Sequence, residues 1–370
     1  MKSEIKIAAV LGITIAIAVG VLGIIFSSLD SEFESTAVIE DNHGQGISID
    51  KSKFKIAPDL VGIAHYLNTT PEQLASEMEG KVVLYDIWTY SCINCIRTLP
   101  YITAWNDKYS DEGLLIIGIH SPEFEFEKDK DNVELAMAKH GIEYPVVMDN
   151  DWETWKAFEN RYWPRKYIAD HEGYIRYDHI GEGAYQETEK IIQQLLAERS
   201  LSLGVQMASA ESLVDIEEFE HTIFRTPELY FGYELAQGRN QLGSAEGFNQ
   251  NKITSYSEPD TIDLHKFYLV GDWTNFNDGM RLESDVGSIK VLYHAKEVNI
   301  VTANSAELEI FLDGSPLNQK YSGKDIESEN ILKVSEPDLY NIITSEKSAT
   351  HELEIKVNQK GFEIYSFTFG

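Results

Sequence analysis

The sequence predicts an α/β domain followed by an all-β domain, with a membrane-spanning segment ahead of both. Three patterns predict this order. A long apolar run stands near the start of the chain, short apolar runs then alternate with helical stretches, and from about Thr226 short alternating runs follow one another. A chain of 370 residues is long enough for two domains and connecting segments.

Composition excludes some classes of partner. The chain is 43% hydrophobic and 25% charged, which is ordinary for folded soluble protein. Its formal net charge of -30 argues against nucleic acid and against anionic lipid surfaces, because both require clustered Lys and Arg. We interpret the acidic surface as a solubility feature, in preference to a surface for a basic partner.

The apolar run Ile7–Phe26 is predicted to be one transmembrane helix, because it can cross the hydrocarbon core of a bilayer. Lys2 and Lys6 precede it and acidic residues follow, so residues 1–6 are expected in the cytoplasm and the domains outside it. The expected location is therefore the cell membrane, with a single pass. Polar residues 27–56 would form a tether.

A cleaved signal peptide is the alternative for this segment. Its apolar core would be shorter, and Ser27-Ser28-Leu29 is a poor cleavage site. Both interpretations place the domains on the same side of the membrane.

Residues 57–200 have the pattern of the α/β domain, and residues 201–225 are predicted to be a linker. Strands alternating with helices imply a sheet covered on both faces. A turn at Asp170–Gly173 predicts that the last two strands form a hairpin. Strands are expected at 81–88, 114–119, 144–148, 166–169 and 174–180, and helices at 132–140, 151–161 and 185–198, with a further helical stretch after Cys95 interrupted by Pro100.

Residues 226–370 are predicted to form an antiparallel β-sandwich. The short alternating runs lie at 268–270, 288–293, 298–301, 306–312, 352–357 and 363–369, with turn signals at Asp313-Gly314 and Lys360-Gly361. Aromatic residues such as Trp273 and Tyr293 could stack on a sugar, but such residues are more often part of a core.

The chain has two cysteines, which could form a structural disulfide, a metal site or a redox pair. A protein of this size that relied on disulfides would usually have more of them. A four-cysteine zinc site is impossible, and no closely spaced His pair completes a mixed site, so no metal is expected. Redox chemistry is the use that remains.

Cys92-Ile-Asn-Cys95 lies between a buried strand and a helix that begins near Cys92. Unpaired N–H groups and the helix dipole at that end favour a thiolate. Cys92 is therefore the expected nucleophile in disulfide exchange, and Cys95, one turn later, the resolving residue. The alternative is a static local disulfide or two inert thiols.

Two further features fit this chemistry. Asp86 stands in the apolar strand before Cys92, where burial would raise its pKa and let it relay the proton of Cys95. The alternative is a carboxylate bonded to backbone N–H groups at a strand end. Trp163-Pro164 precedes the strand 166–169. A cis Pro164 would place the backbone of Trp163 beside the cysteines, where it could contact a substrate strand, whereas a trans proline would only open an edge strand.

The segment Asp86–Pro100 resembles the active-site region of TlpA/DipZ-type thioredoxin-like proteins. Further DipZ-like motifs are His120–Lys128, Asp149–Trp155, Asn160–Pro164, Gly181–Tyr185, Thr226–Tyr233, Gly271–Thr274, Leu312–Gly314 and Tyr365–Gly370. The resemblance implies a thioredoxin fold outside the cytoplasm and a jelly-roll-like C-terminal module similar to carbohydrate-binding modules. It assigns Cys92 as nucleophile, Cys95 as resolving residue, Asp86 as buried carboxylate and Pro164 as cis-proline. No cofactor is expected.

The sequence also departs from these relatives. Many DipZ proteins carry a polytopic CcdA-like region where this chain has one apolar segment, which leaves the electron source open. Ser91 replaces a Trp common before the first cysteine, and Thr98 stands where some TlpA-like proteins have Glu. The proton path would then depend on Asp86 alone.

The expected function is reduction or isomerisation of disulfides in exported proteins, with a CcdA-type membrane donor and glycan contact by the β domain as further partners. The alternatives are a peroxiredoxin-like peroxidase and a surface-anchored binding module that uses the β domain. The C-x-x-C spacing opposes the first, and the intact cysteine pair opposes the second.

Overall fold

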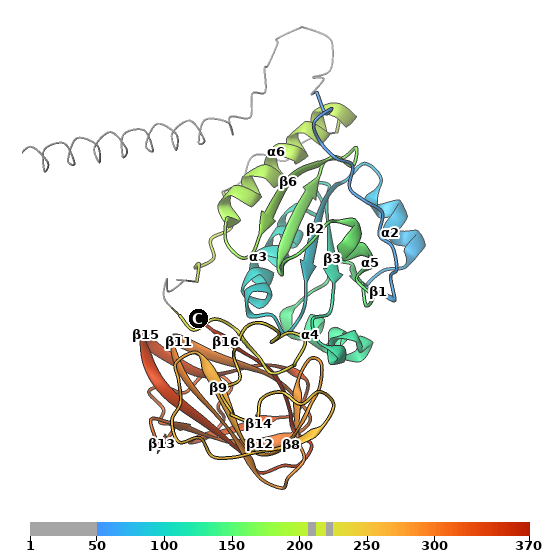
Figure 1. Ribbon diagram of the computed structural model, residues 1–370. Helices are drawn as coiled ribbons and strands as arrows, with labels where there is room; N and C mark the ends of the chain where they lie inside the picture. Colours follow the sequence, from blue (N-terminus) through green and yellow to red (C-terminus); the bar gives the residue numbers. More distant parts are fainter. Residues whose placement is uncertain (1–49, 206–211, 220–224) are drawn as a thin grey trace, which may run out of the picture. The chain divides into compact units, whose positions relative to one another are not determined.

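A computed structural model describes residues 50–205, 212–219 and 225–370 (Figure 1). The predicted cytoplasmic segment 1–6, the transmembrane segment 7–26 and most of the tether 27–56 lie outside these residues. Among the described residues, we find no helix with both the length and the apolar character needed to cross a bilayer. Residues Lys53–Gly370 belong to one structural unit.

A six-stranded mixed sheet organises the α/β region. In sheet order its strands are β1 (His65–Leu67), β4 (Val146–Met148), β3 (Leu114–His120), β2 (Val82–Trp88), β5 (Arg165–Ala169) and β6 (Ile175–Ile180). Strands β2, β3 and β4 run parallel, while the other pairings are antiparallel. Every residue of β2 and β3 is buried, which explains their nearly continuous apolar sequences. The β5–β6 pairing confirms the predicted hairpin.

Helices cover both faces of this sheet, as the alternating pattern predicted. They are α2 (Pro71–Met78), α3 (Ile93–Tyr109), α4 (Lys130–His140), α5 (Glu153–Ala157) and α6 (Tyr185–Leu203), with a 3-10 turn η2 at Glu125–Lys128. Residues of α3, α4 and α6 share a core with one face of β2, and residues of α2 and α5 share a second core with the other face. Figure 1 shows α3 and α2 on opposite sides of the strands.

Two predicted helices differ from those observed. Helix α3 continues through Pro100 instead of being interrupted there. Proline removes one backbone donor, but the buried side chains of Leu99 and Ile102 hold this part of the helix against the core. Helix α5 is shorter than the predicted 151–161, because Trp152 and Glu159 on either side have positive φ angles of 60° and 53°.

The C-terminal region is all-β, as predicted. Its strands are β7 (Leu229–Tyr230), β8 (Ile253–Tyr256), β9 (Lys266–Asn275), β10 (Met280–Leu282), β11 (Gly287–Ala303), β12 (Ala306–Leu312), β13 (Ser315–Pro316), β14 (Ile331–Val334), β15 (Asp338–Val357) and β16 (Glu363–Phe369). All of them belong to one hydrogen-bonded sheet, in the order β13-β12-β15-β11-β16-β10-β9-β8, with β14 paired to β12 and β7 to β16. Shifts of register interrupt the regular pairing of the two long strands β11 and β15.

The interior of this region decides the role of two predicted aromatic residues. Trp273 and Tyr293 are both 0% exposed and belong to its hydrophobic core. A ring with no exposed surface cannot stack on a sugar. The suggestion that these two residues contact a glycan is therefore wrong, and their interpretation as core residues is confirmed.

Candidate active site

The two cysteines stand at the start of α3, directly after the loop that leaves β2. Cys92 caps the helix, is half-buried, and its Sγ accepts the N–H of Cys95 at 3.4 Å. Cys95 is buried one turn further on, and both cysteines are free thiols. Burial, with the hydrogen bond to Cys92, raises the pKa of the Cys95 thiol well above its ordinary value. The pair thus has one accessible sulfur and one sheltered sulfur.

Asp86 lies in the middle of β2 and is 1% exposed. Its Oδ1 has no hydrogen-bond partner among the described residues. Burial raises the pKa of Asp86 to about 6, although the charge of Lys166 acts in the opposite direction. The charge of Asp86 in turn contributes to the raised pKa of Cys95. The structure therefore brings the predicted carboxyl group into electrostatic contact with the sheltered thiol.

Lys166 is a site residue that the sequence reasoning missed. It stands opposite Asp86 in the β2–β5 register, is 0% exposed, and its Nζ donates to the carbonyl of Gly181 at 3.2 Å. Burial lowers the pKa of Lys166, while Asp86 and Cys95 act to raise it. A lysine directly before the apolar residues Tyr167–Ala169 of a strand was the available signal, because lysine is seldom buried without a partner.

Trp163 and Pro164 lie at the entry to β5. Their peptide bond is cis, and Pro164 is buried. The Trp163 indole donates to the carbonyl of Ser121 at 2.9 Å and lies 4.3 Å from the ring of Trp155. Cys92 and Trp163 are both half-buried and both pack against the same core cluster.

Glu127 is a second residue that the sequence reasoning missed. This carboxylate is 0% exposed and accepts hydrogen bonds from Thr89 and Ser91, which belong to the loop before Cys92. The neighbouring His120 is also buried, which lowers its pKa to about 3 and keeps its imidazole neutral. The hydroxyls of Thr89 and Ser91 both donate to the Glu127 carboxylate, so buried hydrogen bonds hold the loop before Cys92 in place.

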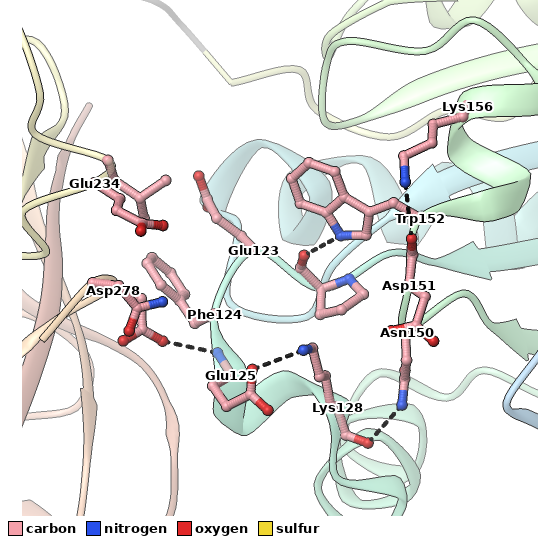
Figure 2. Close-up of a pocket in the computed structure, with 13 residues that line it drawn as sticks. Glu123, Phe124, Glu125, Lys128, Asn150, Asp151, Trp152, Lys156, Glu234 and Asp278 are labelled. Atoms are coloured by element: carbon pink, nitrogen blue, oxygen red, sulfur yellow. Dashed lines mark hydrogen bonds and ion pairs between the residues drawn. The ribbon is translucent and has the colours of Figure 1, made fainter.

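A pocket of about 420 Å³ lies beside this part of the fold (Figure 2). Its lining combines Glu123, Lys128 and Trp152 of the α/β region with Glu234 and residues 277–278 of the β region. The Trp152 ring also lies 5.5 Å from the ring of Trp163. Across the described ranges, no group of three or more His, Cys, Asp or Glu side chains is arranged to hold a metal ion.

Comparisons with known proteins agree with this geometry. Residues 53–196 match the Redoxin family, and residues 226–370 match a family described as a thioredoxin-like C-terminal domain. The chain is 35% identical over 317 residues to Protein DipZ of Mycobacterium tuberculosis, a match that covers 85% of this chain and 43% of DipZ. The chain therefore spans less than half the length of that relative.

A smaller relative is covered almost completely. The thiol-disulfide oxidoreductase YkuV of Bacillus subtilis is 34% identical over 143 residues, which cover 38% of this chain and 94% of YkuV. Among solved structures, a thioredoxin-like protein studied in solution in its oxidized form is 31% identical, with a TM-score of 0.36, and the match covers 40% of this chain and 99% of that one. The chain belongs to the thioredoxin-like thiol–disulfide oxidoreductases and is a homologue of DipZ.

Proposed function

We propose that this enzyme reduces or isomerises disulfide bonds of exported polypeptides, with Cys92 as nucleophile and Cys95 as resolving residue. The supporting observation is the pairing of a half-buried Cys92 at the start of α3 with a buried Cys95 whose N–H bonds to the Cys92 sulfur. A thiolate at a helix start is stabilised by the free N–H groups there.

In the first step, the Cys92 thiolate attacks one sulfur of a substrate disulfide. The substrate S–S bond breaks, its other sulfur leaves as a thiolate and takes a proton, and a mixed disulfide with Cys92 forms. In the second step, Cys95 loses its proton and attacks the Cys92 sulfur. The second substrate sulfur then leaves, and the Cys92–Cys95 disulfide remains. Two electrons have passed to the substrate, so an external dithiol must reduce the enzyme again.

Asp86 is proposed as the base of the second step. The Cys95 thiol is buried and its pKa is raised, so it needs a proton acceptor. Asp86 is also buried, interacts electrostatically with Cys95, and has a pKa near 6, which suits proton transfer near neutral pH. We propose that the backbone beside Trp163 and Pro164 contacts the substrate chain, as in strand addition.

An insulin-disulfide reduction assay on the full chain tests the proposal. We expect turnover with a dithiol donor, none for Cys92→Ala, and full activity for Ser202→Ala, an exposed serine on α6. Equilibration with glutathione gives the direction of electron flow. A potential near −270 mV, roughly that of thioredoxin, supports a reductase, whereas about −120 mV would make the enzyme an oxidase. An inactive wild type would overturn the proposal.

We further propose that residues 7–26 anchor the enzyme in the cell membrane, with residues 27–56 as tether and residues 57–200 and 226–370 as the two extracytoplasmic domains. The apolar run and the lysines before it support this topology. A membrane dithiol donor of CcdA type would then lie within reach. Membranes washed at alkaline pH should retain the full chain, and release of the protein by that wash would contradict an anchor.

A further inference from the structure

Glu127 holds the segment that leads into Cys92. Its Oε1 accepts the hydroxyl of Thr89 at 2.5 Å, the hydroxyl of Ser91 at 2.6 Å and the N–H of Ser91 at 3.3 Å. Because Ser91 directly precedes Cys92, this single oxygen fixes the backbone immediately before the nucleophile. The Ser91 N–H is buried, and a buried donor without an acceptor is costly.

The other oxygen of the same carboxylate holds a second segment. Oε2 accepts the N–H of Glu123 at 2.6 Å and the N–H of Phe124 at 2.9 Å. Glu127 therefore accepts five hydrogen bonds, more than the roughly four lone-pair sites of a carboxylate, so the longest of them, from the Ser91 N–H at 3.3 Å, shares Oε1 with the two hydroxyl donors. Burial raises its pKa, while the bonds from Ser91, Thr89 and the backbone of Phe124 and Glu123 act against that rise. The side chain has no exposed surface, so it cannot touch a substrate.

The segment 123–125 is in turn held by the β region. The Tyr230 hydroxyl donates to Glu123 at 2.9 Å, and the ring of Tyr365 lies 5.2 Å from that of Phe124. The N–H of Glu125 donates to the carboxylate of Asp278 at 3.0 Å, as the dashed line in Figure 2 shows. Three neighbouring residues thus contact three separate side chains of the β region.

The first turn of α3 has contacts of the same kind. Ile93, which stands between the cysteines, and Ile96 pack against a hydrophobic cluster that includes Val301 and Tyr365 of the β region. Arg97 forms an ion pair with Glu297 of β11 at 2.8 Å. The β region therefore contacts both the redox helix directly and the loop before it through the segment 123–125.

We propose that Glu127 is a positioning residue for Cys92, and that through it the β region holds the redox loop, residues 89–91 directly before Cys92, in its reactive position. This inference rests on the proposed attack by Cys92. The Glu127 carboxylate accepts hydrogen bonds both from the redox loop and from the segment 123–125, which the β region contacts. Displacement of that segment moves Glu127, and displacement of Glu127 releases Ser91.

Glu127→Gln in the full chain tests the role, with Glu134→Gln as the matched control on the exposed side of α4. Glutamine keeps the size of the side chain. If its oxygen accepts the N–H groups of Glu123 and Phe124, its amide faces the Ser91 N–H and leaves that donor unbonded. We expect kcat/KM to fall about tenfold, the scale of one lost hydrogen bond to a charged group.

A second measurement separates positioning from a purely structural role. Glutamine also removes a negative charge close to the Cys92 loop, and such a charge disfavours a thiolate. At a fixed glutathione ratio, we expect the ratio of the dithiol form to the disulfide form to rise by about threefold or more, as expected for one charge in a partly screened site. A slower enzyme with a more populated dithiol form supports the proposal. A rate and a redox equilibrium equal to those of Glu134→Gln would overturn it.

The link to the β region is tested by a double-mutant cycle with Tyr230→Phe. If the β region acts through Glu127, the double variant should be no slower than Glu127→Gln, whereas effects that multiply would refute the link. Should Glu127→Gln fail to fold, Ser91→Ala, which removes one donor but keeps the charge of Glu127, must lower kcat/KM without raising the dithiol form, and an unchanged rate would overturn the proposal. Inactivity of the wild type would instead count against the proposed function itself.

Discussion

Replacement of Asp86 by asparagine should stabilise the α/β region at neutral pH. Burial raises the pKa of Asp86 from 3.8 to about 6, so the folded state binds this proton more tightly than the unfolded state does. The resulting stability is fully present below about pH 4 and is lost as the pH rises through 6. One pKa unit corresponds to ~1.4 kcal/mol, so ionised Asp86 costs about 3 kcal/mol at pH 7.5.

Asparagine carries no charge and avoids that cost. We expect Asp86→Asn to raise the free energy of unfolding by up to about 3 kcal/mol at pH 7.5 and by well under ~1 kcal/mol at pH 4, where the wild-type carboxyl is already protonated. The gain at pH 7.5 is an upper bound, because buried Lys166 loses a neighbouring negative charge.

Denaturant unfolding of the reduced protein at the two pH values measures this difference. Tryptophan fluorescence is a suitable signal, since Trp273 is the only one of the six tryptophans in the β region. Asp111→Asn, at an exposed position, is the control and should change stability by less than ~0.5 kcal/mol at either pH. Equal effects of Asp86→Asn at both pH values, or a loss of stability at pH 7.5, would refute the reasoning.

The same variant should be a slower enzyme, because asparagine cannot accept the proton of Cys95. A loss of a base of this kind is worth roughly 100-fold or more in rate. The first step does not need Asp86, so the mixed disulfide with substrate should accumulate. An active variant with no accumulation would show that another group takes the proton.

Three other substitutions have defined outcomes. Cys95→Ala should trap the mixed disulfide with Cys92, visible on a non-reducing gel, and absence of that band would contradict the assigned roles. Lys166→Met should raise the pKa of Asp86 further, because the charge of Lys166 lowers it. The fall in unfolding free energy, which begins near the ordinary pKa of 3.8, should then continue to a higher pH, and an unchanged pH profile would argue against this electrostatic contact. Ile102→Ala leaves a cavity under α3 and should cost about 2–5 kcal/mol in denaturant unfolding, whereas a loss below ~1 kcal/mol would mean that the core collapses around it.

Local patterns in the sequence were enough for the elements that position the cysteines. The apolar run 81–88 became β2 (Val82–Trp88), because a strand buried on both faces is mostly apolar, with Asp86 as the charged exception. The C-x-x-C segment became the first turn of α3. The β region was harder: runs at 288–293 and 298–301 belong to one strand, β11, whose register shifts near Ala295 and Glu297. A bulge breaks the alternation, so one strand looks like two.

The residues that the sequence missed owe their roles to distant partners. Lys166 faces Asp86 only because β5 pairs with β2 in that register. Glu127 lies 36 residues beyond Ser91 and meets it only because β3, which precedes Glu127, pairs alongside β2, which precedes Ser91. Spacing along a chain reports helical turns and strand alternation, but it does not report which strands become neighbours. The buried carboxylate that was recognised, Asp86, was visible because its own strand is apolar.

Asp86 and Glu127 show how one fold gives two buried carboxyl groups different tasks. Among the described residues, one oxygen of Asp86 has no hydrogen-bond partner. Burial favours its protonated form while the charge of Lys166 favours its ionised form, and the resulting pKa near 6 lets it exchange a proton during turnover. Glu127 is surrounded by five donors, which would all lose an ionised acceptor if it took a proton. Proton transfer therefore suits Asp86, and fixed anchoring suits Glu127. It follows that a change in turnover centred near pH 6 should disappear in Asp86→Asn and persist in Glu127→Gln.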